Sequence, residues 1–283
     1  MPDYSCRRMS EADSVPILDN DGVRRRLRLV TVALLVAATA AAAQYDAPGR
    51  RGGAPDVRYD GQFTFVRLRW GSDLSSSLFG GGFGGGRRGF SSAWNHDYPR
   101  AEQNLSRIID EVTGVHIRVD GSLILTLDDP ELFNYPIAFM WEPGFWNLTD
   151  REAASFRAYL SKGGFAVFED FDGRPQWDVF ETQMRRVLPG ARFVKLDKTH
   201  RIFDSFFQVK DIDAIVHPMS GIRPSYYGIF EDNDPSKRLM VVANFDNDVP
   251  EYWEWSGQGL FPFDASNEAY KLGVNYVIYG LTH

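Results

Sequence analysis

The sequence lacks the residues on which several large enzyme classes depend. Only one of its 283 residues is a cysteine, Cys6. A structural disulfide needs two cysteines, and thiol catalysis needs a cysteine within the folded domain. Cys6 precedes the position at which we expect the chain to be cleaved. The mature protein would therefore have neither a disulfide nor a thiol nucleophile.

Other signatures are missing as well. The sequence has no G-x-S-x-G elbow of a serine hydrolase and no H-E-x-x-H zinc motif. The glycines of residues 80–86 are not followed by the Lys-Ser/Thr of a phosphate-binding loop, so they predict a surface loop or a lid. The net charge is −7 and no basic patch stands out, which argues against a nucleic-acid partner.

The first 43 residues predict an export signal. A basic segment, residues 24–28, precedes an apolar run rich in Ala and Val, residues 29–43, which ends in a small-residue site. We expect cleavage near Ala43 and a periplasmic or secreted protein. The alternative is an uncleaved leader that anchors the chain in a membrane, since the run is close to the minimum spanning length. Residues 44–60 are rich in Gly, Pro and Arg and predict a flexible linker before a single α/β domain, residues 61–283.

Beyond residue 60 the apolar pattern alternates between strand and helix. Thr149 and Glu152 have the spacing of a capping box at the start of one helix. Alternating elements with apolar strands predict a three-layer α/β fold, with a mainly parallel sheet and helices on both faces. Strands are predicted at 62–70, 115–119, 137–141, 165–169, 192–196 and 239–244, and helices at 96–114, 148–164, 176–188 and 266–281.

Acidic side chains follow several of these strands. Glu169, Asp170 and Asp172 follow a buried run, and Asp246 and Asp248 follow the last strand. Loops at such strand ends are where α/β folds usually bind ligands. Clustered carboxylates can bind a divalent cation or act as general acid and base, although no motif requires a cofactor. Carboxylates also form helix caps and turns, which is the alternative for Asp97 near the start of helix 96–114 and for Asp172 in an Asp-Gly turn.

Two histidines and one group of aromatic residues complete the candidates. His96 and His200 each lie beside acids where a loop meets a helix or strand. Trp141 belongs to an aromatic segment that could stack on a sugar, with core packing as the alternative. The candidate catalytic residues are thus Asp170, His200, Asp97 and His96, and the candidate ligand-binding residues are Glu169, Asp172, Trp141 and Asp246.

Several stretches resemble a known bacterial family. They are "WNHDYPRAEQNL", "NYPIAFM", "FRAYLSKGGFAVFEDFDG", "THRIFDSFF" and "KLGVNYVIYGLTH", and together they resemble domain of unknown function 4159 from about residue 60 to the C-terminus. The resemblance implies a flavodoxin-like fold similar to that of class I glutamine amidotransferases, with an unassigned activity. It also implies export or attachment to membrane proteins, and in some members AAA ATPase and von Willebrand A partners.

The same resemblance excludes amidotransferase chemistry. In the amidotransferases the nucleophilic cysteine stands where a strand ends after a glycine-terminated helix, and here that position falls on or near Glu169 or Asp170. A carboxylate cannot replace the thiolate in glutamine hydrolysis. Sugar-utilisation proteins of related fold carry a histidine after a later strand. The segment "DKTHRIFDSF" resembles that region, which keeps His200 as a candidate base or ligand.

Two functions follow from the sequence. We favour a non-catalytic module of the cell envelope that binds a small polar or carbohydrate ligand, or a partner protein, at the strand ends. The alternative is a hydrolase, carbohydrate-directed or metal-dependent, that uses Asp170 and His200 with Asp97 and His96. Convergence of these side chains would favour the hydrolase. Their dispersal, or Asp97 acting only as a helix cap, would favour the binding module.

Overall fold

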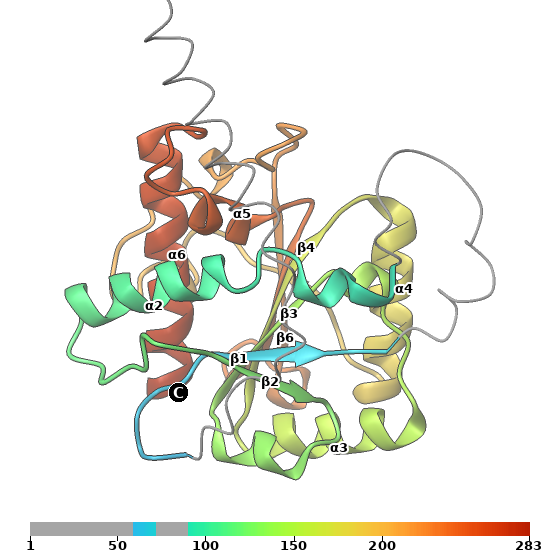
Figure 1. The fold of residues 1–283 in the computed structure, drawn as a ribbon. Helices are drawn as coiled ribbons and strands as arrows, with labels where there is room; N and C mark the ends of the chain where they lie inside the picture. The colour runs from blue at the N-terminus through green and yellow to red at the C-terminus, as the bar shows by residue number, and fades with distance from the viewer. Residues whose placement is uncertain (1–58, 72–89) are drawn as a thin grey trace, which may run out of the picture. The chain divides into compact units, whose positions relative to one another are not determined.

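The computed structural model describes residues 59–71 and 90–283, which are coloured in Figure 1. The predicted signal segment, nearly all of the predicted linker and the glycine-rich loop 80–86 lie outside these ranges. No helix within the two ranges has the length and apolar character needed to cross a membrane.

One sheet organises the described residues, with seven strands in the order β2-β1-β3-β4-β7-β6-β5. The pairings from β2 to β7 are parallel, and β6 and β5 add two antiparallel pairings. The five parallel strands are β2, β1, β3, β4 and β7. When they are counted in chain order, with β7 as the fifth, they have the strand order 2-1-3-4-5 of doubly wound sheets. In this order the chain first adds a strand on one side of β1 and then adds the remaining strands on the other side. The strands are β1 (Val66–Arg69), β2 (Leu123–Thr126), β3 (Ile137–Trp141), β4 (Phe165–Phe171), β5 (Val194–Lys195), β6 (Ser225–Phe230) and β7 (Leu239–Phe245).

Helices cover both faces of the sheet (Figure 1). On one face α2 (Arg100–Val112), α5 (Val249–Glu254) and α6 (Phe263–Thr282) share an apolar core with the strands. On the other face α3 (Asp150–Ser161) and α4 (Gly173–Val187) form a second core. Successive residues of β3 enter these two cores in turn, so the whole strand is buried. The predicted three-layer, mainly parallel α/β fold is confirmed.

The capping box is also confirmed. The Thr149 hydroxyl accepts a hydrogen bond from the backbone of Glu152, whose carboxylate accepts one from the backbone of Thr149. Short 3-10 helices connect the larger elements: η1 (Phe90–Asn95), η2 (Pro130–Asn134), η3 (Pro143–Phe145), η4 (Arg201–Phe203), η5 (Ile212–Ala214) and η6 (Glu231–Asn233).

The predicted strand at residues 115–119 is wrong. Only Ile117 forms a bridge there, to Phe63, and β1 pairs instead with β2 at residues 123–126. His116 and Val119 are exposed, so the segment lacks the buried face that an interior strand needs. The sequence pattern also fails to predict the short edge strand β2 and the strand β6.

Two glycines allow α6 to pack closely against its neighbours. A Cβ added to Gly273 would lie 2.7 Å from a ring carbon of Trp253 and 2.8 Å from Leu105 Cδ1. A Cβ added to Gly280 would lie 2.5 Å from Ile137 Cγ1. Close packing therefore outweighs the cost of about 1 kcal/mol that a glycine imposes within a helix.

We expect Gly273→Ala to lower the free energy of unfolding by about 1–3 kcal/mol, because overpacking exceeds the gain in helix propensity. Gly114→Ala is the control, since nothing lies within 4 Å of a Cβ added there. Urea denaturation of both variants and the parent measures the difference. A Gly273→Ala variant as stable as the parent would contradict the close packing of α6.

Candidate functional site

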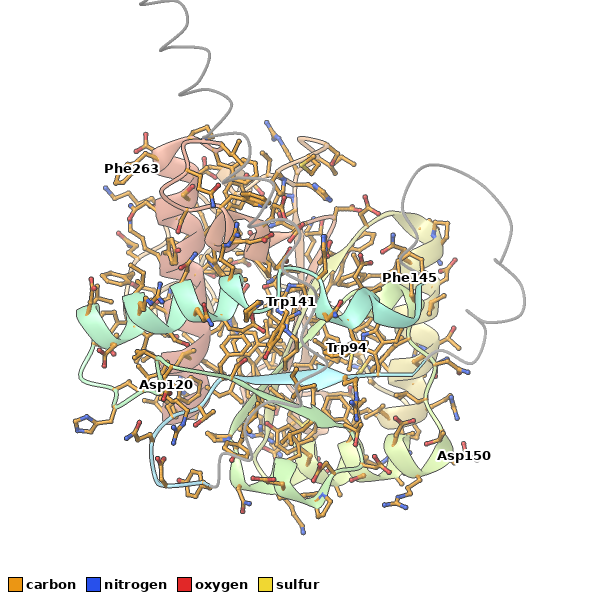
Figure 2. The ribbon with its side chains drawn as sticks, in the orientation of Figure 1. Trp94, Asp120, Trp141, Phe145, Asp150 and Phe263 are labelled. Carbon is orange, nitrogen blue, oxygen red and sulfur yellow. The ribbon has the colours of Figure 1, made fainter. Side chains whose placement is uncertain are left out.

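Functional side chains gather where the parallel strands end. His96 and Asp97 lie in the connection from β1 to α2, Asp170 is the penultimate residue of β4, and Asp248 follows β7. The carboxyl ends of parallel strands meet at one edge of a sheet, and ligands bind there beside the point where the strand order reverses. Trp141, the last residue of β3, marks this edge near the centre of Figure 2.

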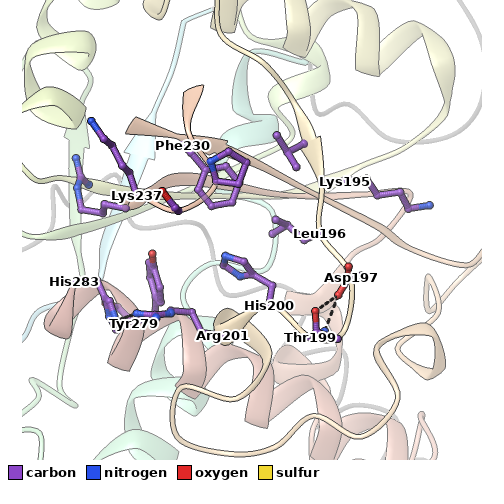
Figure 3. Close-up of a pocket in the computed structure, with 14 residues that line it drawn as sticks. Lys195, Leu196, Asp197, Thr199, His200, Arg201, Phe230, Lys237, Tyr279 and His283 are labelled. Carbon is purple, nitrogen blue, oxygen red and sulfur yellow. Dashed lines mark hydrogen bonds between the residues drawn. The ribbon is translucent and has the colours of Figure 1, made fainter. Parts of the chain in front are cut away.

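His200 does not belong to this group. Its Nδ1 accepts a hydrogen bond of 3.2 Å from the backbone of Ile202 at the start of η4, and its ring contacts Phe230 (Figure 3). Phe230 is the last residue of β6, which runs antiparallel to β7. His200 therefore lies at the edge where the parallel strands begin, opposite His96.

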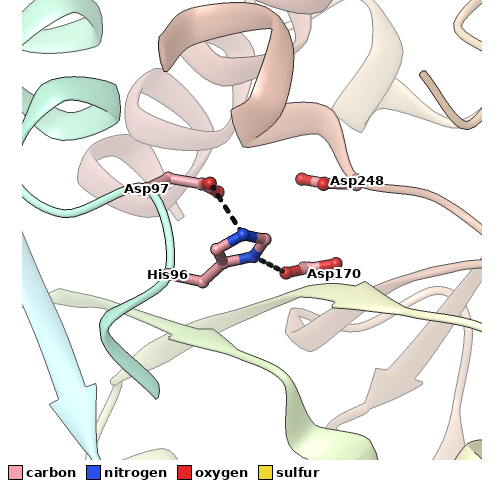
Figure 4. A group of neighbouring side chains, drawn as sticks. All are labelled: His96, Asp97, Asp170 and Asp248. Atoms are coloured by element: carbon pink, nitrogen blue, oxygen red, sulfur yellow. Dashed lines mark hydrogen bonds and ion pairs between the residues drawn. The ribbon is translucent and has the colours of Figure 1, made fainter. Parts of the chain in front are cut away.

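The other three catalytic candidates converge, and Asp248 joins them (Figure 4). One nitrogen of His96 and one oxygen from each of the three aspartates all lie within 4.8 Å of one another. His96 Nδ1 is 2.7 Å from Asp170 Oδ2, and His96 Nε2 is 3.8 Å from Asp97 Oδ1. The aspartates are buried, whereas the His96 side chain is 52% exposed. The group is thus accessible from the histidine side.

Unusual backbone conformations accompany this group. Asp97, Glu142, Asp170 and Asp246 all have φ between 53° and 60°, the left-handed region that non-glycine residues rarely adopt. Each such residue costs on the order of 1 kcal/mol, and such residues cluster at functional sites. The strain at Asp170 coincides with a shift in the register of β4 against β7. The shift moves Asp170 out of the strand alternation, so its carboxylate lies beside His96 instead of entering the core.

A buried arginine holds the connection from β1 to α2. Arg67 of β1 is fully buried, and its Nε lies 2.5 Å from Glu102 Oε1 of α2. Its Nη1 donates hydrogen bonds of 3.0 Å to the carbonyl of Trp94 and 2.8 Å to that of His96. The guanidinium also lies 3.5 Å from the centre of the Trp141 ring. Arg67 thereby fixes the backbone of His96 relative to β1, β3 and α2.

Asp97 is not the cap of α2, and the interpretation of this residue as a helix cap is wrong. Pro99 occupies the cap position, and no side chain caps the helix. Asp97 Oδ2 accepts a hydrogen bond of 2.9 Å from Trp141 Nε1. The buried Oδ1 has no hydrogen-bond partner in the described part of the chain. A buried carboxylate oxygen without a hydrogen bond is costly, so this atom calls for a proton or a cation.

Asp97 also faces a second pair of acids on α5. Oxygens of Asp97, Glu251 and Glu254 lie within 4.8 Å of one another. Burial, together with the charge of Asp97, raises the pKa of Glu251 and of Glu254 to about 7. Arg100 is 3.8 Å from Glu254, at the outer side of this pair.

The group holds more negative charge than its cations neutralise. Burial and the charge of Asp170 raise the pKa of Glu142, which follows β3, to about 9. Burial also raises the pKa of Asp170, and it raises that of Asp248 well above the usual value. The hydrogen bond to Asp170 raises the pKa of His96 to about 10. These directions agree that the group retains protons at neutral pH unless a cation binds.

The predicted ligand-binding residues lie around this centre in different roles. Trp141 is buried and orients Asp97. Glu169 is fully buried and accepts a hydrogen bond from Asn244, and burial raises its pKa well above the usual value, so it is a core acid. Asp246 accepts a 2.9 Å hydrogen bond from the backbone of Gly173, and Asp172 Oδ2 is 3.9 Å from His217 Nε2, so both shape the neighbouring loops.

Sequence reasoning missed three contributors to the site. Asp248 lies in the acidic segment after β7 but is not among the candidate site residues above. Its side chain caps α5 by accepting a 3.2 Å hydrogen bond from the backbone of Glu251. Glu142 follows a wholly apolar strand, a position that could have been recognised. Arg67 alternates with the apolar residues Val66 and Leu68, a pattern that predicts a polar side chain facing away from the core. Nothing in the sequence reveals that its guanidinium is buried.

We expect the chelated protein to lose stability as the pH rises from about 5 to about 9. A carboxyl group whose pKa is raised by folding binds more protons when folded, so the free energy of unfolding falls as pH rises toward the folded pKa. Glu142 and Glu251, with pKa values of about 9 and 7, both act in this direction. His96 adds to it, because its raised pKa contributes stability that is lost as the pH approaches 10.

Urea unfolding in chelator at about pH 5.5, 7 and 8.5 measures this dependence. Asp170→Asn, which removes one charge from the group, should flatten it. A free energy of unfolding in the parent that is constant or rises over this range would contradict the description of the group as overcharged.

The family described as "Domain of unknown function (DUF4159)" matches residues 85–281, a range that includes His96, Asp97, Asp170 and Asp248. No curated protein matches the chain significantly. The match covers most of the chain and confirms the family to which the sequence stretches pointed. This chain belongs to the family described as Domain of unknown function (DUF4159).

Proposed function

We propose that this protein is a hydrolase that depends on a divalent cation bound by His96, Asp97, Asp170 and Asp248. The observation that carries the proposal is the convergence of one imidazole nitrogen and three carboxylate oxygens within 4.8 Å. The buried Asp97 Oδ1, which has no hydrogen-bond partner among the described residues, also supports it. Four such donors are sufficient to coordinate a divalent metal ion.

The donor set favours some cations over others. Ca²⁺ and Mg²⁺ prefer oxygen ligands alone, whereas a mixed set with imidazole suits Zn²⁺ or another first-row transition metal. Metal binding requires neutral His96 and ionised carboxylates. Because His96 Nδ1 lies 2.7 Å from Asp170 Oδ2 in the structure, the cation must displace a proton shared by this pair. Affinity should therefore rise with pH.

The surrounding residues can supply the proton transfers of hydrolysis. A divalent cation at this position would lower the pKa of water and polarise the bond to be cleaved. Glu142 and Glu251 border the group and are only partly buried. Either can hold a proton and release it to a leaving group, as general acids do. Arg67, which is bound to the carbonyl of His96, keeps the histidine in place during such a step.

The charge of the site favours an uncharged or cationic substrate. The carboxylates exceed the nearby cations, and such a field repels phosphate esters and other anions. Trp94 and Trp255 are partly exposed and adjoin the two acid groups in sequence, where their rings could stack on a sugar. We therefore propose a neutral or amino-sugar glycan as the substrate, and an exported protein as its setting.

Metal binding is the first test. After treatment with chelator, the full chain is titrated with Zn²⁺, Mn²⁺, Ca²⁺ and Mg²⁺ by calorimetry, and we expect one site with the highest affinity for Zn²⁺ or Mn²⁺. Loss of a ligand in Asp170→Asn or Asp248→Asn should weaken binding at least as much as the roughly 10- to 100-fold that loss of an outer-shell partner costs. Asp120→Asn is the control, since that side chain is 78% exposed.

Two outcomes would contradict the metal site: no binding by any of these cations, or equal affinity in parent and both variants. Circular dichroism of each variant checks that it is folded.

Activity is the second test. The metal-loaded protein is incubated with neutral and amino-sugar oligosaccharides, and release of new reducing ends or of acetate is measured with and without chelator. We expect turnover that is lost in chelator and in Asp170→Asn but kept in Asp120→Asn. Cation binding without turnover on any substrate would favour the non-catalytic binding module.

A further inference from the structure

The edge of the sheet opposite the acidic group contains a separate cavity (Figure 3). Its volume is about 690 Å³, within the range of sites that bind small molecules. It is lined by residues 194–197 and 199–201, by the segment 235–238 before β7, and by Phe230, Tyr279 and His283. Since β7 begins just after this segment, the cavity lies where the parallel strands start.

The cavity is basic although the chain as a whole is acidic. Four cationic side chains line it, against the single carboxylate of Asp197, whereas the net charge of the chain is −7. Two of the four cations are already engaged: Lys237 lies 2.6 Å from Asp232, and Arg238 donates to the carbonyl of Gly164.

The other two cations have no acidic partner. Arg201 Nη1 is 2.8 Å from His283 Nε2, and neither Arg201 nor Lys195 forms an ion pair with any carboxylate in the residues that the structure describes. The carboxylate of Asp197 is occupied by the backbone and the hydroxyl of Thr199. Arg201 is thus free to bind an anion in the cavity, whereas the Lys195 side chain points away from it (Figure 3).

Two neutral hydrogen-bond donors, His200 and Tyr279, also line the cavity. Because His200 Nδ1 accepts from the backbone of Ile202, the neutral ring carries its proton on Nε2. Burial and the charge of Arg201 lower the pKa of His200, which keeps the ring neutral at pH 7. The hydroxyl of Tyr279 accepts a 2.9 Å hydrogen bond from the backbone of Leu239, which leaves its own hydrogen free to donate.

We propose that this cavity binds a small molecule that carries a phosphate group. The free groups that line it are donors or cations, which suits a ligand rich in acceptor oxygens. A phosphate monoester has a charge of about −1.5 to −2 at neutral pH, and the guanidinium of Arg201 offers it a positive partner that no carboxylate occupies. The ring of Phe230 offers apolar surface to the organic part. The cavity lies opposite the proposed metal centre, so phosphate binding does not depend on the proposed hydrolase.

Calorimetry with inorganic phosphate and with adenosine monophosphate, in chelator, tests the proposal. We expect both to bind, with lower affinity at higher ionic strength. Arg201→Gln should weaken binding by roughly tenfold or more, the usual effect of losing a charged hydrogen-bond partner. Lys195→Gln should bind as the parent does, because that side chain points away from the cavity (Figure 3). Lys195 makes no ion pair, so its replacement leaves the fold intact. Lys198→Gln, an exposed neighbour that does not line the cavity, should bind as the parent does.

Three results would overturn the proposal. They are no binding of either compound at 20 mM, undiminished binding in Arg201→Gln, and a loss of affinity in Lys198→Gln equal to that in Arg201→Gln. Thermal unfolding of each variant checks that a loss of binding is not a loss of folding.

Discussion

The buried contacts of Arg67 are the interaction on which the strand-end site depends. One guanidinium links β1 to α2 through Glu102, holds the carbonyl of His96 and lies against the ring of Trp141. Trp141 in turn donates a hydrogen bond to Asp97, so Arg67 and Trp141 together fix the orientation of His96 and Asp97. A buried charge is tolerated only when it is paired, so Arg67 and Glu102 depend on each other. Loss of either side chain would leave the other charge buried and unpaired. The site is therefore built on the rigid sheet.

The strand-end site lowers the free energy of unfolding of the protein. It combines residues at positive φ with carboxyl groups whose pKa values burial has raised. Two apolar cores, one on each face of the sheet, offset this destabilisation through the burial of apolar side chains. Local strain and unneutralised charge that persist together at one edge of an otherwise regular fold are typical of functional sites. A divalent cation would relieve the charge, and this is why we favour the hydrolase over the binding module.

The sequence was informative where local patterns decide the structure. Alternating apolar runs predicted the sheet and most helices, and acids at strand ends pointed to Asp170 and Asp97. It failed where tertiary packing decides. The edge strand β2 is only four residues long, and Asp248 joins the site only because β7 lies beside β4. His200 was a candidate because it lies beside acids at the end of a loop and because of an analogy with other proteins. The antiparallel strands β5 and β6 place it instead at the far edge of the sheet.

The account rests on one cation position, which anomalous scattering from crystals soaked in Mn²⁺ can locate. We predict one dominant peak bounded by His96, Asp97, Asp170 and Asp248, and its disappearance in Asp170→Asn crystals. A map with no peak among these four side chains, or one that survives unchanged in the variant, would contradict the metal-centred account of this protein.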